Sequence, residues 1–197
     1  MNLIHLMRTD FVEVIDDFLT QSYYESLRAS VTDPGFPWYF QDNVTYESSE
    51  IEGVYINENP INNSFGFSHV IYFNSEVRSQ VGNLFMPFAF QVKDYLKASE
   101  IMRVRLDMTV YNPDTRMHGP HIDYNDTPHY SAVYYINDSD GPTVLFNEKQ
   151  GQDSLTIKET IDPKPNRLLL FDGSYIHTGY SPSRHNSRVL INSNYIP

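Results

Sequence analysis

The spacing of the apolar residues changes after Ala98, from about 3.6 residues per repeat to about 2. In the stretch MRVRLDMTVY (102–111), one face of an extended chain carries Met102, Val104, Leu106, Met108 and Val110. The other face carries Arg103, Arg105, Asp107, Thr109 and Tyr111. Further strand-like runs, separated by turn residues, lie at 130–136, 143–146, 167–171 and 188–196. The second half of the chain is therefore expected to consist mainly of strands.

Helical patterns come before these strands. After a strand expected at 11–16, Ser22 is followed three positions later by Glu25, a capping-box pattern that predicts the start of a short helix. The side chains of this helix that should face inward are Tyr24, Leu27 and Val31. Apolar residues recur at helical spacing again from Ser75 to Leu96, and Pro87 within them predicts two helices or one kinked helix.

The segment 33–64 is rich in Pro, Gly, Asn, Ser and acidic residues. Such a composition predicts loops, with one or two short strands at apolar patches such as 54–56.

Helices followed by many strands predict an α+β fold, mainly β, with an antiparallel sandwich or jelly roll as its core. The chain of 197 residues fits a single domain, 1–197, with a helix-rich part at 1–100 and a jelly-roll core at 101–197. One face of each strand in a small barrel can line a cavity. Alternation alone favours the solvent side for the polar face of 103–111, because sheets of this kind often have one wet face.

Composition excludes several classes of protein. The chain has no cysteine, so disulfide scaffolds and Cys-ligated zinc are ruled out. Its formal charge of −11, without a Lys/Arg cluster, argues against a nucleic-acid partner. No run of 18 apolar residues predicts a membrane span, and the acidic residues of the first twenty positions argue against a signal peptide. A cytoplasmic location is expected.

The stretch HGPHIDYN (118–125) places His121 and Asp123 two positions apart, so their side chains point to the same side of an extended segment. A His-x-Asp pair is a weak signal by itself. A second histidine, His177, follows an apolar strand and a turn. Two imidazoles and one carboxylate form a facial triad that leaves three positions of an iron(II) ion open. Arg188 opens the last strand, and its planar fork could bind a carboxylate ligand through two hydrogen bonds.

These residues, in this order, resemble the iron(II)- and 2-oxoglutarate-dependent oxygenases, most closely the prolyl 4-hydroxylase-like branch. The resemblance runs from about residue 101 to the C-terminus and includes the blocks VYYIN (133–137), GPTVLF (141–146) and NRLLLFDGSYIHTG (166–179). The opening VEVIDDFLTQSYYESL also resembles that branch, whereas 33–74 matches nothing recognisable.

The resemblance implies a double-stranded β-helix that binds Fe(II), 2-oxoglutarate and O2. It makes His121, Asp123 and His177 the metal ligands. The residues that it assigns to the cosubstrate are Arg188 and Tyr135, at the distal carboxylate, and Tyr111, near the metal. It also turns the polar face of 103–111 into the barrel, where Arg105, Asn192 and Asn194 become candidates to line the cavity or contact substrate.

The reaction that the resemblance implies is hydroxylation of a C–H bond in a peptidyl proline or another small or peptidyl substrate. Substrate choice would depend on the loops 33–74 and 112–130. Three other interpretations stay open: a nucleic-acid dealkylase, which usually has a second arginine where this chain has Asn194; a cupin-type metalloenzyme; and a barrel that binds a ligand without catalysis. His118 and His129 are expected at the surface or beside the substrate, and His5, His69 and His185 at the surface.

Overall fold

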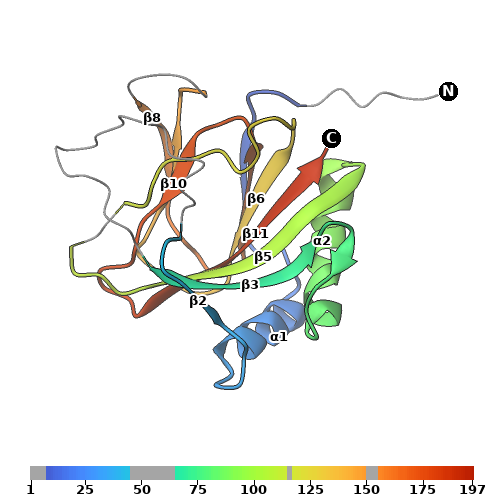
Figure 1. Ribbon diagram of the computed structural model, residues 1–197, viewed down its shortest axis with the longest axis vertical. Helices are drawn as coiled ribbons and strands as arrows, with labels where there is room; N and C mark the ends of the chain where they lie inside the picture. The colour runs from blue at the N-terminus through green and yellow to red at the C-terminus, as the bar shows by residue number, and fades with distance from the viewer. Residues whose placement is uncertain (1–7, 45–64, 115–116, 150–154) are drawn as a thin grey trace.

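The computed structural model describes residues 8–44, 65–114, 117–149 and 155–197, and its core is a pair of facing antiparallel sheets (Figure 1). The strands of the large sheet, in spatial order, are β1 (Val12–Ile15), β9 (Arg167–Asp172), β6 (Tyr130–Tyr135), β11 (Ser187–Ile196), β5 (Glu100–Val110), β3 (Gly66–Phe73) and β2 (Tyr39–Gln41), with β4 (Glu76–Val77) paired to β3. The small sheet has the order β10 (His177–Gly179), β7 (Thr143–Phe146) and β8 (Ile157–Ile161). The helices are α1 (Gln21–Thr32) and α2 (Gly82–Leu96).

The strands expected from alternation are all present. They correspond to β1, β5, β6, β7, β9 and β11, within two residues at each end. Four strands were not expected: β3, β4, β8 and β10. Four of the five residues of β8 are exposed, so no alternating burial marks it, and β10 is too short to show a period. The patch 54–56 lies outside the described residues.

Both helices cover one face of the large sheet, and the small sheet lies on its other side (Figure 1). On the helix-covered face, Val104 and Leu106 of β5 join a core cluster with Leu27 of α1 and Phe88 of α2. A second cluster fills the space between the sheets, where Tyr135 of β6 packs with apolar residues of both. β6, β9 and β11 are therefore buried on both faces, and Arg103, Arg105 and Asp107 on the polar face of β5 are partly buried, as the resemblance implied and not as alternation alone favoured.

α1 differs in one detail from the predicted helix. It begins at Gln21, and its N-cap Thr20 makes no side-chain hydrogen bond, so the capping box expected at Ser22 is wrong. Glu25 instead accepts a hydrogen bond from the Gln21 amide at 2.9 Å. The inward side chains are those predicted: Tyr24, Leu27 and Val31.

α2 is one helix with Pro87 in its interior. The Tyr23 hydroxyl of α1 accepts from the Phe88 N–H at 2.9 Å and donates to the Leu84 carbonyl at 2.8 Å. A side chain thus replaces a hydrogen bond of the helix ladder next to the proline, which keeps both backbone groups satisfied. Val77, expected at the start of this helix, belongs to β4.

None of the helices in the described part of the chain has the length and apolar character that a membrane span requires. The cytoplasmic location and the single domain at 1–197 stay predictions.

Candidate active site

The structure brings His121, Asp123 and His177 together: one ligand atom from each lies within 4.8 Å of those of the other two. The backbones of the two histidines form an isolated antiparallel bridge, with both N–H···O distances at 2.9 Å. Ile122, between the first two, packs into a buried apolar cluster with Val144 and other residues. The apolar contacts of Ile122 therefore fix the backbone of residues 121–123, from which His121 and Asp123 point the other way.

Both imidazoles are oriented by their own backbone. Nδ1 of His121 donates to the Gly119 carbonyl at 3.0 Å, and Nδ1 of His177 donates to the Tyr175 carbonyl at 3.1 Å. A carbonyl can only accept, so each Nδ1 carries the proton and each Nε2 presents a lone pair, as a metal ligand must. Burial lowers the pKa of His177 to about 4, which keeps this imidazole neutral at physiological pH.

Asp123 lies between the imidazoles and is held at both oxygens. Its Oδ1 and Oδ2 are 3.8 Å from Nε2 of His121 and His177, respectively. Arg103 Nη2 donates to Oδ1 at 2.8 Å, while Asn194 Nδ2 at 2.8 Å and Ser131 Oγ at 3.3 Å donate to Oδ2. Burial alone would raise the pKa of Asp123, but Arg103, the histidines and the Asn194 hydrogen bond hold it well below its usual range.

A second polar group lies deeper in the barrel, around Arg188. Arg188 Nη2 donates to Thr143 Oγ1 at 2.7 Å, and the Tyr135 hydroxyl lies 2.6 Å from the same oxygen. The guanidinium is also 5.6 Å from the centre of the Tyr135 ring. Burial lowers the pKa of Arg188 and raises that of Tyr135. Arg188 Nε and Thr109 Oγ1 are buried and have no hydrogen-bond partner among the described residues, so this end of the barrel has donors that a ligand could satisfy.

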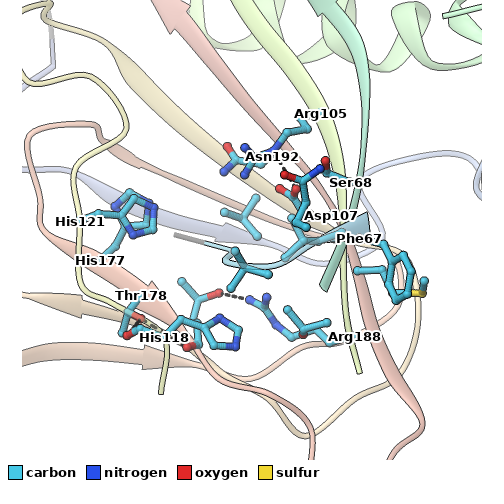
Figure 2. A pocket seen from close by; sticks show the side chains of 18 of the residues that line it. Phe67, Ser68, Arg105, Asp107, His118, His121, His177, Thr178, Arg188 and Asn192 are labelled. Carbon is cyan, nitrogen blue, oxygen red and sulfur yellow. Dashed lines mark hydrogen bonds and ion pairs between the residues drawn. The ribbon is translucent and has the colours of Figure 1, made fainter. Parts of the chain in front are cut away.

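A cavity of about 90 Å³ connects the two polar groups. Figure 2 shows His121 and His177 on one side of it, Arg105, Asp107 and Asn192 across from them, and Arg188 with His118 at the far end. These side chains come from the inward faces of β5, β10 and β11 and from the loop before Asp123.

The residues proposed from the sequence to line the cavity divide into two groups. Arg105 and Asn192 do line it, whereas Asn194 is fully buried and donates to Asp123. Tyr111 follows the end of β5, is 53% exposed, and is not among the described residues that line the cavity. The cosubstrate role expected for Tyr111 stays a prediction that this geometry does not support.

Sequence reasoning missed Arg103, Thr143 and Asp107. Arg103 and Asp107 lie on the same face of β5 as Arg105. The alternation that pointed to Arg105 therefore also pointed to Arg103 and Asp107. Thr143 opens the expected strand at 143–146, but nothing in the sequence pairs it with Arg188.

Three further histidines are buried: His69, which was expected at the surface, and His118 and His129, which were expected at the surface or beside the substrate. His118 lines the cavity, and its Nε2 forms a hydrogen bond of 3.0 Å with Ser181 Oγ. Burial lowers the pKa of His118 to about 3. His69 lies between the Pro37 carbonyl and Ser79 Oγ, and His129 is buried with its Nδ1 on the Thr127 carbonyl. His5 lies outside the described residues.

In the part of the chain that the structure describes, two helices pack against a pair of facing sheets, and a His–Asp–His set that could hold a metal ion lies where His177 of the small sheet approaches Asp123. This arrangement defines a double-stranded β-helix with a candidate metal site. Residues 106–196 match the family model of the 2OG-Fe(II) oxygenase superfamily. The matched residues, somewhat less than half of the chain, include His121, Asp123, His177 and Arg188, so this part of the chain is similar to oxygenases that depend on Fe(II) and 2-oxoglutarate.

Solved structures with the same fold include two prolyl hydroxylases and a protein with nickel and 2-oxoglutarate bound. A prolyl-4-hydroxylase from Pseudomonas putida is 14% identical over 94% of this chain and 92% of that one, with a TM-score of 0.59. A prolyl hydroxylase from Trichoplax adhaerens, in complex with a hypoxia inducible factor oxygen degradation domain peptide fragment, is 15% identical over 94% and 83%, with a TM-score of 0.62. HygX from Streptomyces hygroscopicus, with nickel and 2-oxoglutarate bound, is 13% identical over 94% and 82%, with a TM-score of 0.54.

At these identities the likeness establishes the fold, and it confirms the double-stranded β-helix expected from the sequence. No curated protein sequence matches the chain significantly.

Proposed function

We propose that the protein hydroxylates a C–H bond of a small or peptidyl substrate, peptidyl proline included, with Fe(II) held by His121, Asp123 and His177. The observation that carries the proposal is a cavity with His121 and His177 of this donor set at one end and the buried Arg188 at the other. The donors fit Fe(II), since two neutral imidazoles and a carboxylate leave open positions for further ligands.

2-Oxoglutarate fits the other end of the cavity. Arg188 and Thr143 would take its distal carboxylate, because a buried guanidinium with a partnerless Nε needs an anion more than a neutral ligand. The bound metal would supply dioxygen activation, and the overall reaction converts substrate, 2-oxoglutarate and O2 into hydroxylated substrate, succinate and CO2. Val133 and Leu190 give the cavity an apolar part of its wall, which would help to keep water away from the bound 2-oxoglutarate and the metal.

A peptide is the substrate class with the most support. The Trichoplax adhaerens enzyme, which shares the fold, was solved with a peptide fragment. The wall opposite the histidines carries Arg105 and Asp107, with Arg105 Nε 2.7 Å from Asp107 Oδ1. A substrate with polar groups of either sign, such as a peptide main chain, would find a partner there.

Turnover without substrate is the decisive experiment. The purified protein is mixed anaerobically with Fe(II) and 2-oxoglutarate, the visible charge-transfer band of the chelate is recorded, and succinate is assayed after oxygen is admitted. We expect a band and succinate that are both lost in His177→Ala. A protein that binds the metal but gives no band at millimolar 2-oxoglutarate would refute the role of Arg188 and favour a barrel with another purpose.

A further inference from the structure

Arg103 reaches the carboxylate of the proposed metal site from the strand next to it. Its Nη2 lies 2.8 Å from Asp123 Oδ1, and its guanidinium lies over the Tyr124 ring, 5.5 Å from the ring centre. The Arg103 side chain is 15% exposed and that of Asp123 4%. The pair is thus shielded from water, where an ion pair restricts geometry more strongly than at the surface.

Three neighbouring strands converge on this one carboxylate. Arg103 on β5 is directly opposite Asn194 on β11, and Asn194 is directly opposite Ser131 on β6. Arg103 holds Oδ1, while Asn194 and Ser131 hold Oδ2. The orientation of Asp123 is therefore set by the register of the large sheet and not by the loop that carries it.

The arrangement matters because a carboxylate can bind a metal through one oxygen or through both. The two oxygens of Asp123 are equally placed, each 3.8 Å from one imidazole Nε2. Binding through both would occupy a position that 2-oxoglutarate or dioxygen needs. Arg103 on one oxygen and Asn194 with Ser131 on the other hold the carboxylate from both sides, so a rotation that brings both oxygens to the metal at equal distance would strain these hydrogen bonds.

We propose that Arg103 is a positioning residue that restricts Asp123 to one oxygen donor and so keeps a coordination position open for the cosubstrate. The inference rests on the proposed function, and it assigns Arg103 an effect on cosubstrate binding that differs from its effect on metal binding. A residue that merely held Asp123 in place would affect both in the same direction.

The test measures the two affinities separately with Co(II), by calorimetry and without turnover. The first titration gives the dissociation constant for Co(II), and the second gives that of 2-oxoglutarate for the Co(II)-loaded protein. The variants are Arg103→Gln, Arg103→Met and Arg103→Lys. The control is Arg78→Gln, a half-exposed arginine that pairs with Glu76 far from the cavity.

Arg103→Gln and Arg103→Met should bind Co(II) as tightly as the wild type, within threefold, or more tightly, and bind 2-oxoglutarate at least tenfold more weakly. Arg103→Lys should lie between them and the wild type, because an ammonium keeps the charge but lacks the fork that fixes the carboxylate. Asn194→Ala, which removes the shorter of the two hydrogen bonds to Oδ2, should show the same separation to a smaller extent. If circular dichroism shows that Arg103→Gln and Arg103→Met do not fold, the comparison of Arg103→Lys with the wild type decides the role of Arg103.

Two results would overturn the role of Arg103. One is unchanged 2-oxoglutarate affinity in all variants, and the other is a tenfold loss of Co(II) affinity that accounts for the whole effect. A wild-type protein that binds Co(II) but not 2-oxoglutarate would instead refute the proposed function itself.

Discussion

The two ends of the cavity are built on opposite principles. At the metal end, the three ligand side chains already have partners within the protein: each Nδ1 has a backbone carbonyl, and Asp123 accepts from three side chains, although Arg103 Nε and Asn194 Oδ1 find no partner among the described residues. At the Arg188 end, the atoms that would meet a ligand, the guanidinium Nε and Thr109 Oγ1, are themselves buried without a partner among the described residues. The metal end is therefore preorganised, whereas the Arg188 end is completed by its ligand.

The charges differ in the same way. Asp123 is compensated by Arg103 at 2.8 Å. Among the described residues, no carboxylate lies within ion-pair distance of Arg188, which instead shares Thr143 with Tyr135. A buried cation without a counterion favours an anionic ligand, so selectivity for a dicarboxylate is expected to come from the Arg188 end.

The largest effect is expected from Asp123→Ala, which should reduce succinate formation to the background of the metal-free protein. It should also leave Arg103 without its carboxylate and lower the free energy of unfolding by about 2 kcal/mol, less than for a fully buried pair because Arg103 keeps some exposure. A succinate assay measures the loss of turnover, and urea unfolding measures the change in the free energy of unfolding.

A double variant separates the two effects of Asp123→Ala. Asp123→Ala with Arg103→Met should recover much of the stability and none of the turnover. Full activity in Asp123→Ala would remove Asp123 from the metal site, and unchanged stability would show that the Arg103 pair is too hydrated to matter.

Arg188→Met tests the other end. Loss of a charge-assisted clamp should weaken 2-oxoglutarate binding ten- to a hundredfold, about 1.4–2.8 kcal/mol, while Co(II) affinity stays the same. Calorimetry on the Co(II)-loaded protein gives both values. Arg184→Met is the matched control, because Arg184 lies in the loop before β11 with a largely exposed side chain. A greater effect from Arg184 than from Arg188 would mean that the clamp has been assigned to the wrong arginine.

The sequence was sufficient for the central strands because their residues alternate between two distinct environments. Val104 and Leu106 face the helices and Arg105 and Asp107 face the cavity, so the pattern has a period of two even though both faces are at least partly buried. β8 and β10 have no such contrast, since one is mostly exposed and the other has three residues. The start of α1 was misplaced because a capping box is a local signal, and this helix begins without a side-chain cap.

The candidate site was predictable wherever spacing along one strand was enough. His121 and Asp123 share a face by their separation of two, and Arg188 follows from strand parity. The contacts of Arg103 with Asp123 and of Thr143 with Arg188 depend on the register between strands far apart in the chain, which a single sequence does not contain. Resemblance alone gave Tyr111 its role, and burial is the property that separates it from Tyr135.

A pH series tests whether the Arg188 end is as dry as its geometry implies. The pKa of His118 is lowered to about 3 by burial, so the unfolded chain takes up a proton first, near pH 6.5, and stability falls as pH drops below that value. Between pH 7.5 and 5.5 this histidine should cost about 1.4 kcal/mol of unfolding free energy. His118→Gln, which keeps a polar group beside Ser181, should remove that part of the pH dependence in urea unfolding. Parallel curves for the wild type and the variant would mean that water reaches His118.

The smallest effects are expected from the two tyrosines, and they decide between resemblance and geometry. The hydroxyl of Tyr135 bonds Thr143 Oγ1, which also receives Arg188, so Tyr135→Phe should loosen the clamp and weaken 2-oxoglutarate binding three- to fivefold, about 0.7–1 kcal/mol. Tyr111→Phe removes a hydroxyl from a half-exposed ring outside the cavity lining and should change the affinity by less than twofold. Calorimetry on the two Co(II)-loaded variants is sufficient to resolve this difference. A larger loss in Tyr111→Phe than in Tyr135→Phe would mean that the segment after β5 turns its tyrosine into the cavity when the cosubstrate binds, and that the metal end is less fully preorganised than its hydrogen bonds imply.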